Sequence, residues 1–398
     1  MPRKADATIR PMPRLGIQAS VTLVVMSEAS PSSRYSASAS FRHNQAPIDA
    51  VLMVQLGTPE AAEPAAVRRY LAQFLSDPRV VEIPRLLWMM ILHGIILRFR
   101  PAASAKKYAS IWTENGSPLA LHTIAQANAL AKRMQSTHPG LTVRYAMRYG
   151  EPSISRVMRE LREQGMQRLL VLPLYPQYAA STTATVWDEV FTELKRWRNL
   201  PELRMVRNFH RDQAYIDSLA NRIREHWALK GRGEKLVFSF HGVPKRSLLL
   251  GDPYHCECHV TARLLAQALG LAPDAYQLTF QSRFGRAEWL QPYTEPTLIE
   301  LAKQGVRRVD VFCPGFVSDC LETLEEIAQE AKHAFIEAGG EHFEYISCVN
   351  DRTDFIEALA QRVQASTSDW QSLQSRESVS ASAAEERLKR AKALGADR

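Results

Sequence analysis

The sequence predicts an α/β protein of two similar Rossmann-like lobes, each a parallel four-stranded sheet flanked by helices. Three observations lead to this. Short apolar runs alternate with helical stretches between residues 48 and 365. The runs are apolar throughout, as are strands of a sheet that is covered on both faces. One order of turn, helix start and strand also recurs in both halves of the chain.

The predicted strands are short apolar runs bounded by turn residues. A weak eighth run lies near Met205. The other seven cover residues 51–57, 143–150, 168–178, 235–242, 276–282, 308–316 and 343–350.

The recurring pattern consists of an Arg-aromatic-Gly turn, a Glu-Pro pair that opens a helix and an Arg that starts the next strand. These motifs begin at residues 148, 151 and 168 in the first half and at 283, 295 and 308 in the second. The repeat predicts lobes over 48–210 and 233–365. Ligands of such sheets bind beyond the carboxyl ends of the strands, so we look for functional residues there.

The two ends of the chain differ from the body. Residues 1–47 are rich in Ser, Ala and Pro and predict a disordered extension. Their Arg- and Ser-rich, acid-poor composition resembles a transit peptide, but a true start at Met26 is the plainer explanation. Residues 366–398 predict a charged tail with a solvated helix.

Composition narrows the classes of function. The 398 residues are 45% hydrophobic and 23% charged, as in an ordinary globular protein. The net charge of +8 falls to +3 in the body, without a basic block, so we expect no nucleic-acid partner. Five scattered Cys indicate thiols in a reducing compartment. No run reaches the roughly 20 apolar residues of a membrane span, and we expect a cytoplasmic protein.

His241 is placed at a strand end, where chemistry is expected. It follows the run Leu-Val-Phe-Ser-Phe and precedes Gly242, so it is presented at the edge of the second sheet. Its imidazole can accept a proton or bind a metal ion near neutral pH. A histidine that only caps the strand is the alternative.

An acidic segment follows the 308–316 strand. Asp319 and Glu322 have the spacing of a helix N-cap and its capping-box partner. With Glu326 they fall at i, i+3 and i+7, on one face of a helix. One interpretation is an acidic first turn that the helix dipole favours, which explains Asp319 and Glu322 but not Glu326. The other is a path for a divalent cation or for protons.

Two further segments have alternative interpretations. The apolar stretch 84–99, flanked by arginines, is either a buried core helix or an exposed lip that contacts a greasy ligand or a membrane surface. Residues 255–259 (His-Cys-Glu-Cys-His) offer soft metal ligands without a second ligand pair at zinc-finger spacing. We interpret them as the start of a helix without a catalytic role.

Taken together, seven motifs resemble those of ferrochelatase, the enzyme that inserts ferrous iron into protoporphyrin IX in the last step of haem synthesis. They occur in the family's order between residues 50 and 365. The motifs are LGTPE (56–60), GSPL (116–119), RYGEPSI (148–154), LPLYPQYAASTTAT (172–185), FSFHGVPKRSLLLGDPY (238–254), TFQSRFGRAEWLQPYTEP (279–296) and GFVSDCLETLEEI (315–327).

The resemblance implies roles for particular residues. His241 matches the residue that binds metal or accepts pyrrole protons, and Glu322 its partner as an iron ligand. Asp319 and Glu326 match an acidic path. The implied porphyrin contacts are Leu56, Arg100, Tyr108, Ser117, Arg148, Tyr149, Trp289 and Phe316.

Some positions differ from the animal enzymes and indicate a bacterial type. Cys320 stands where those enzymes have His, and Leu56 where they have Met. No Cys follows Cys348, so the C-terminal [2Fe–2S] cluster of animal enzymes is not expected. We expect no permanently bound cofactor, because Fe²⁺ is a substrate of the reaction. We also expect residues 84–99 to make a peripheral contact with a membrane.

Two alternatives remain at this stage. The chain could metallate another tetrapyrrole such as coproporphyrin III, although the apolar lip favours the less charged protoporphyrin. It could also be a haem or porphyrin carrier, but a carrier has no use for a line of carboxylates. The oligomeric state does not follow from the sequence.

Overall fold

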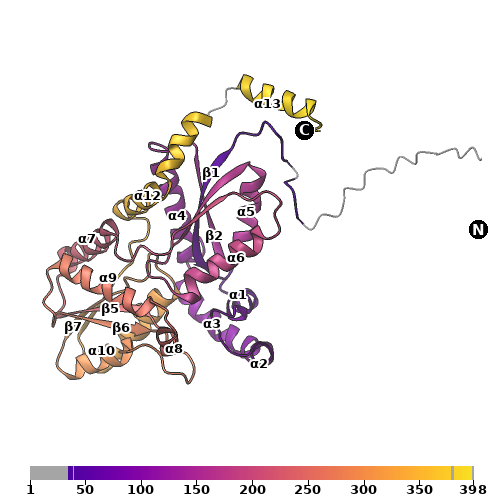
Figure 1. Ribbon diagram of the computed structural model, residues 1–398. Helices are drawn as coiled ribbons and strands as arrows, with labels where there is room; N and C mark the ends of the chain where they lie inside the picture. The colour runs from indigo at the N-terminus through magenta and orange to yellow at the C-terminus, as the bar shows by residue number, and fades with distance from the viewer. Residues whose placement is uncertain (1–34, 39, 378–380, 397–398) are drawn as a thin grey trace, which may run out of the picture.

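The computed structural model describes residues 35–38, 40–377 and 381–396. It contains two four-stranded parallel sheets, of strand order β2-β1-β3-β4 and β6-β5-β7-β8. Figure 1 shows one sheet in each half of the molecule, covered by helices. The predicted α/β class and the two similar lobes are therefore confirmed.

The first lobe is built around the central strand β1. Its elements are β1 (Ile48–Gly57), α1 (Pro64–Ser76), α2 (Arg85–Ile91), η1 (Leu92–Ile96), α3 (Leu97–Ile111), α4 (Pro118–Met134), β2 (Leu141–Tyr149), α5 (Ile154–Glu163), β3 (Met166–Pro173), η2 (Ala180–Ala184), α6 (Thr185–Leu194) and β4 (Glu202–Met205), where η marks a π-helical segment.

Helix α7 leads into the second lobe, which is built around β5, and two helices follow it. The elements are α7 (Gln213–Lys230), β5 (Lys235–His241), α8 (Lys245–Leu249), α9 (Tyr254–Leu269), β6 (Tyr276–Gln281), α10 (Thr294–Lys303), β7 (Arg308–Phe312), η3 (Glu322–Ala331), α11 (Lys332–Glu337), β8 (His342–Ile346), α12 (Thr353–Glu377) and α13 (Ala381–Ala393).

All eight predicted strands are present, but three end four or five residues before their apolar runs do. β3, β7 and β8 end at residues 173, 312 and 346, whereas the runs continue to 178, 316 and 350. The residues beyond these strand ends, such as Leu174, Cys313 and Val349, are fully buried in loops. Apolar composition therefore does not distinguish a strand from a buried loop.

The internal repeat is confirmed, with one correction to its alignment. The counterpart of Pro152 is Pro292, and not Pro296 as the sequence spacing predicts. The amide of Met147 in β2 donates to the Pro152 carbonyl over 2.7 Å, and that of Phe280 in β6 donates to the Pro292 carbonyl over 2.8 Å. Pro296 lies inside α10. The spacing misleads because the loop after β6 is longer than the loop after β2.

The two lobes share one hydrophobic core. A single cluster of buried side chains includes Met53 and Leu172 of the first sheet and Phe238 and Phe312 of the second. Helix α12 contributes Phe355 to the same cluster and packs against α4 and α7. The strand ends of both lobes are therefore held in a fixed relation by shared packing.

Both predicted boundaries at the chain ends need correction. Ser38 and Ser40 donate hydrogen bonds to the Glu163 carboxylate over 2.7 Å each, so part of the expected disordered extension is attached to α5. The expected tail boundary at residue 366 falls inside α12, where Trp370 is fully buried beside Arg168. Hydrogen bonding by Ser hydroxyls is not visible in composition. Residues 1–34 of the predicted extension lie outside the part of the chain that the structure describes.

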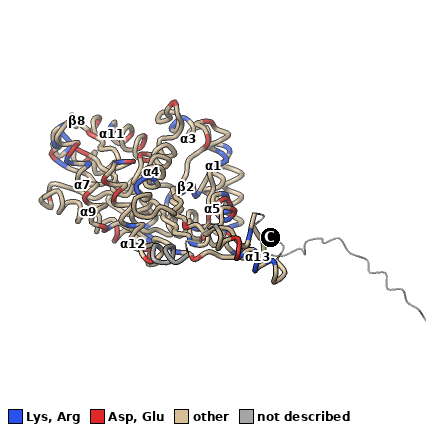
Figure 2. Tube along the Cα trace, turned by 90° about the horizontal axis from the view of Figure 1, so that it is seen from above, with Lys and Arg blue, Asp and Glu red and all other residues tan. Residues whose placement is uncertain are grey.

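Charge is spread over both lobes, as the sequence predicts for the body. Figure 2 shows basic and acidic residues interspersed along the described chain.

Candidate active site

His241 is the last residue of β5 and therefore lies at the carboxyl end of a central strand of the second sheet. Its Nδ1 lies 2.6 Å from the Gly242 carbonyl oxygen. A carbonyl can only accept, so Nδ1 carries the hydrogen and the neutral ring keeps its lone pair on Nε2. The ring is thereby oriented as a base or a metal ligand through Nε2.

Gly242 makes this orientation sterically feasible. Its amide donates to the Gln281 carbonyl over 2.8 Å. A Cβ at this position would lie 2.7 Å from that carbonyl oxygen and 3.2 Å from the Trp289 ring. Only glycine lets the chain pass this close to β6 directly after His241.

Two aromatic residues lie near His241 and the glycine that follows it. The Phe316 ring centroid lies 6.4 Å from that of His241. Trp289 packs against Gly242, and its buried Nε1 has no hydrogen-bond partner among the described residues. The structure thus brings both sequence-predicted aromatic residues to the histidine.

Glu326 is held in place by the end of β6. The Ser282 amide donates to its Oε1 over 2.6 Å and the Ser282 hydroxyl to its Oε2 over 2.5 Å. Gln281 lies 3.4 Å from Oε2. The pKa of Glu326 is raised, chiefly by burial and further by the charge of Glu322. The hydrogen bonds from Ser282 and the charge of His241 act in the opposite direction and lower this pKa. The site therefore couples one histidine and two carboxylates electrostatically.

Glu322 faces the first lobe. The Cys320 thiol hydrogen-bonds to it, and burial together with this contact raises the pKa of Cys320. Tyr108 and Tyr70 have pKa values far above the ordinary range, chiefly through burial, and the Glu322 charge adds to both. Glu322 therefore lies where the second lobe meets the α3 helix, at what we call the interlobe junction (His241, Glu322, Glu326, Tyr108 and Lys107).

Asp319 does not share a helix face with these two carboxylates, contrary to the prediction. The helix begins as a π-helix at Glu322, so the i, i+3, i+7 spacing does not apply and no capping box forms. The Asp319 carboxylate accepts hydrogen bonds from the Tyr345 hydroxyl (2.5 Å), the Cys348 amide (3.1 Å) and the Asn350 amide group (2.7 Å). These hydrogen bonds attach the loop after β7, which carries Asp319, to β8 and to the loop that follows it.

The remaining acidic residue of the segment binds the first lobe. Lys107 of α3 lies 2.9 Å from Glu325 and 2.6 Å from Glu330. Lys107 thus offsets part of the negative charge of the segment, and the Asp319 carboxylate is stabilised by neutral hydrogen-bond donors. The π-helical form also agrees with a functional segment, since such segments are rare and concentrate at functional sites.

The implied porphyrin contacts of the first lobe lie in two places. Leu56, Tyr108 and Tyr149 join one apolar cluster, which Leu321 of the second lobe also contacts. Ser117 is buried and accepts a hydrogen bond from the Thr58 hydroxyl over 2.9 Å.

Arg148 is occupied by a structural network. Its guanidinium donates to Asp77 over 2.6 Å and to the Thr185 carbonyl over 2.9 Å, and the Tyr149 hydroxyl donates to the same Asp77. Burial raises the pKa of Tyr149. These hydrogen bonds occupy both side chains, and the predicted porphyrin contact of the two residues stays a prediction. Arg100 instead stacks on Phe284 of the second lobe.

Sequence reasoning missed the residues that support the site. Gln281 and Ser282, which bind Glu326, stand at the strand end that the fold rule indicated, but neither is ionisable. Ser282 also has a φ of 66°, which a non-glycine residue seldom adopts. Their place at a carboxyl strand end was the available signal.

The His-Cys-Glu-Cys-His segment lies on the first turns of α9, as expected for a helix start. Glu257 accepts hydrogen bonds from the Tyr178 amide (2.7 Å) and the Asn208 side chain (2.7 Å). Cys258 is buried and Cys256 exposed. Within the described residues, no three His, Cys, Asp or Glu side chains converge as a metal site.

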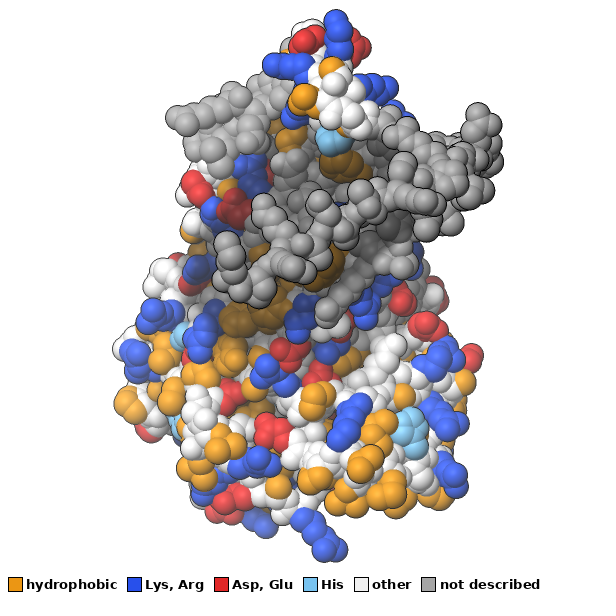
Figure 3. Space-filling model, turned by 45° about the vertical axis from the view of Figure 1, so that its right-hand side comes forward, with side chains coloured by type: hydrophobic (Ala, Val, Ile, Leu, Met, Phe, Trp, Pro, Cys, Tyr) orange, Lys and Arg blue, Asp and Glu red, His pale blue; other side chains and the backbone are white. Residues whose placement is uncertain are grey.

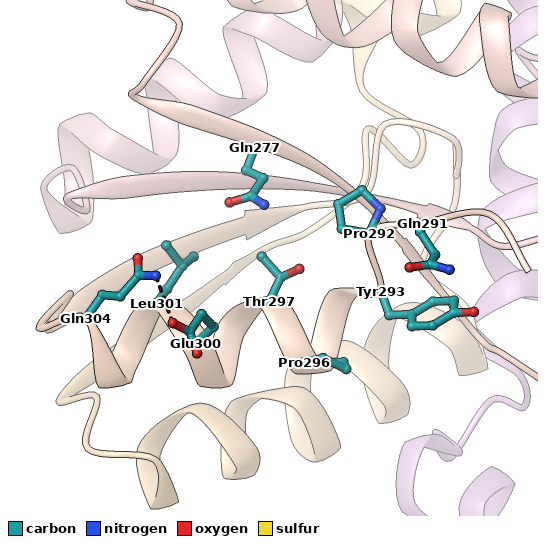
Figure 4. Close-up of a pocket in the computed structure, with 9 residues that line it drawn as sticks. All are labelled: Gln277, Gln291, Pro292, Tyr293, Pro296, Thr297, Glu300, Leu301 and Gln304. Carbon is teal, nitrogen blue, oxygen red and sulfur yellow. Dashed lines mark hydrogen bonds between the residues drawn. The ribbon is translucent and has the colours of Figure 1, made fainter.

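Two surface depressions lie away from these residues. One is lined by Gln277, Pro292, Tyr293 and Glu300, and the other by Arg144, Pro152 and Glu160, at the equivalent place in the first lobe. Figure 4 shows that the first is walled by α10 and the edge of β6, with a Gln304–Glu300 hydrogen bond at its rim. Neither contains a predicted site residue.

Comparison with known proteins identifies relatives of nearly the whole body. The family model described as Ferrochelatase matches residues 48–367. The ferrochelatase of Aromatoleum aromaticum is 60% identical over 323 residues, which are 80% of this chain and 88% of the relative. That of Chromobacterium violaceum is 56% identical over 347 residues, 87% of this chain and 95% of the relative. Among solved structures, SirB from Bacillus subtilis with Fe³⁺ matches at 14% identity and a TM-score of 0.48, covering 81% of this chain and 98% of that one.

Proposed function

Since the chain belongs to the ferrochelatase family and is a lyase that inserts iron into a porphyrin for haem synthesis, we propose that its substrate is protoporphyrin IX and that His241, Glu322 and Glu326 carry out the insertion. The observation that supports this most is the placement of His241. Among the described residues, its ring makes a single hydrogen bond, which fixes Nδ1 and leaves the Nε2 lone pair for chemistry.

The reaction exchanges Fe²⁺ for the two pyrrole N–H protons of the porphyrin. Each pyrrole nitrogen must lose its proton before its lone pair can bind the iron. The arriving iron is held by His241 Nε2 and Glu322. As the iron passes to the two porphyrin nitrogens that carry no hydrogen, the Nε2 lone pair becomes free and accepts a pyrrole proton as general base, a role that contributes typically 10²–10⁴-fold in enzymes. A site with two protein ligands is sufficient for a transient metal, because four porphyrin nitrogens replace them.

Glu326 removes the proton from His241. Its raised pKa lets it hold a proton at a pH where an exposed carboxyl is ionised. The Ser282 amide and hydroxyl keep its two oxygens fixed, so the group does not swing into the space of the macrocycle. Protons then leave along η3 toward the surface.

The substrate assignment is tested with metal-free protein, Fe²⁺ and either protoporphyrin IX or coproporphyrin III under anaerobic conditions. We expect loss of porphyrin fluorescence and appearance of the haem spectrum, with a higher kcat/KM for protoporphyrin IX. A preference for coproporphyrin III contradicts the substrate assignment. Binding of porphyrin without metallation would identify a carrier instead.

We further propose that the lip, residues 84–99, rests on a membrane surface. One helical stretch, Arg85–Ile111, is long and apolar enough to span a membrane. However, 22% of its most apolar 18-residue segment is buried in the protein. Trp88, Leu92 and Leu97 pack into the body, whereas Leu86, Met90 and Phe99 are 84%, 67% and 74% exposed. A helix fastened along one face lies on a bilayer rather than across it.

Figure 3 agrees with this placement, since hydrophobic side chains gather at the lower end of the face shown, where Figure 1 places α2. We expect Leu86→Asp with Met90→Asp to lower binding to phosphatidylcholine–phosphatidylglycerol vesicles at least about tenfold, because two exposed apolar side chains no longer enter the lipid. Activity in detergent should not change. The matched control is Leu229→Asp, at an 83% exposed position of α7. Equal vesicle binding by the double variant and wild type contradicts the proposal.

We propose that the protein holds no resident iron–sulfur cluster. Cys256→Ser with Cys258→Ser should leave the visible spectrum and kcat unchanged, because neither thiol is part of the interlobe junction. Stoichiometric acid-labile sulfide in the purified wild type would overturn this.

A further inference from the structure

Arg100 and Phe284 form a contact between the two lobes. Arg100 belongs to α3 of the first lobe, and Phe284 to the loop between β6 and α10 of the second. The guanidinium carbon lies 4.7 Å from the centroid of the Phe284 ring. Phe284 is 48% exposed, so the ring covers the arginine from one side rather than enclosing it.

The charge of Arg100 is not matched by a carboxylate. Lys107 lies seven residues further along α3, on the same helix face, and also contacts the second lobe. Its ammonium is neutralised by Glu325 and Glu330. Among the described residues, no acidic side chain forms an ion pair with Arg100, and partial burial lowers its pKa. An exposed guanidinium that an aromatic ring holds in place and that no described carboxylate neutralises can bind an anion, unlike the paired Lys107.

The stacked geometry leaves the right atoms free. A guanidinium that lies face-on to an aromatic ring uses its π-face, and its N–H donors point outward in the plane of the group. Those donors match the two oxygens of a carboxylate. The ring therefore reduces the freedom of a long side chain without consuming its hydrogen bonds.

We propose that Phe284 is a positioning residue that holds Arg100 ready for a carboxylate of the porphyrin. The inference rests on the proposed function, in which the ligand is a porphyrin dicarboxylate. It adds that recognition of one carboxylate needs both lobes, since the arginine comes from the first and the ring from the second. The Arg246–Glu82 ion pair (3.0 Å) is a second contact that joins the lip region to the second lobe.

The test measures porphyrin binding to the metal-free protein by fluorescence, with protoporphyrin IX and its dimethyl ester. Phe284→Ala should raise the Kd of the free acid about three- to tenfold, the range of a partly shielded cation–π contact. The Kd of the ester, which lacks the charges, should not change. KM for the acid should rise by the same factor at an unchanged kcat. Phe284→Tyr keeps the ring face and should behave as wild type.

A double-mutant cycle tests the link between the two residues. In the Arg100→Ala background, Phe284→Ala should have no additional effect on the Kd of the acid. Phe191→Ala on α6 is the matched control, since this phenylalanine is 43% exposed and lies outside the site. Additive losses in the cycle overturn the inference, as does an equal loss for acid and ester, which would mean that the ring contacts the macrocycle itself.

The outcome is separable from that of the proposed function. If the wild type neither binds nor metallates porphyrin, the proposed function fails. If it does both and Phe284→Ala binds the acid normally, only the role of Phe284 fails.

Discussion

Replacement of His241 by Ala is expected to lower kcat for iron insertion at least about a hundredfold, the usual contribution of a general base. The methyl side chain offers no atom that could take the pyrrole proton. The other nitrogen of the ring bonds only to the neighbouring Gly242 carbonyl, so its loss leaves no distant partner unsatisfied. The melting temperature should therefore stay within a few degrees of wild type.

Steady-state kinetics with Fe²⁺ and with Zn²⁺ checks this result. His259→Ala is the matched control, because that histidine is exposed on α9 and should leave kcat unchanged. A His241→Ala protein that keeps more than about a tenth of wild-type kcat, equivalent to less than ~1.4 kcal/mol of barrier, contradicts the role of His241 as the base.

The second large effect is expected for Glu322→Gln. If Glu322 ligates the incoming iron, a neutral amide should cut kcat sharply while KM for porphyrin stays near the wild-type value, as expected for an interaction made mainly in the transition state. Glu326→Gln should lower kcat less, because Glu326 acts on protons after they leave the porphyrin. It should also cost about 1 kcal/mol of stability, since the amide cannot accept all three neighbouring donors.

Parallel measurements of kcat, porphyrin KM and thermal stability separate these expectations. Glu337→Gln on α11 is the control, since its side chain is 68% exposed and pairs only with His333. Wild-type turnover in both variants with both metals would show that the carboxylates only shape the start of η3. Loss of activity that follows loss of folding would place the proton path elsewhere.

The fold was largely predictable because strand composition and the internal repeat are local signals. Eight apolar runs gave eight strands, and the repeat gave two sheets of equivalent order. The errors arose where burial is non-local. The loops after β3, β7 and β8 are as apolar as strands because both lobes pack on them, and Trp370 of α12 is buried only through contact with the first lobe.

The site was predictable as far as it consists of ionisable groups at strand ends. His241, Glu322 and Glu326 are brought together there. Asp319 was placed on their helix face because sequence periodicity assumes an α-helix, whereas the segment is a π-helix that starts three residues later. Gln281 and Ser282 act through hydrogen bonds to Glu326, and no pattern in one sequence marks such uncharged supports.

The central claim is that iron meets the porphyrin between His241 and Glu322. Anomalous scattering from crystals soaked with Co²⁺, a spectroscopically visible substitute for Fe²⁺, locates the metal directly. The account predicts a peak about 2.0–2.2 Å from His241 Nε2 and a Glu322 carboxylate oxygen, the bond lengths usual for such ligands. A peak at His255, Cys256 and His259 of α9, with none at His241, would contradict it.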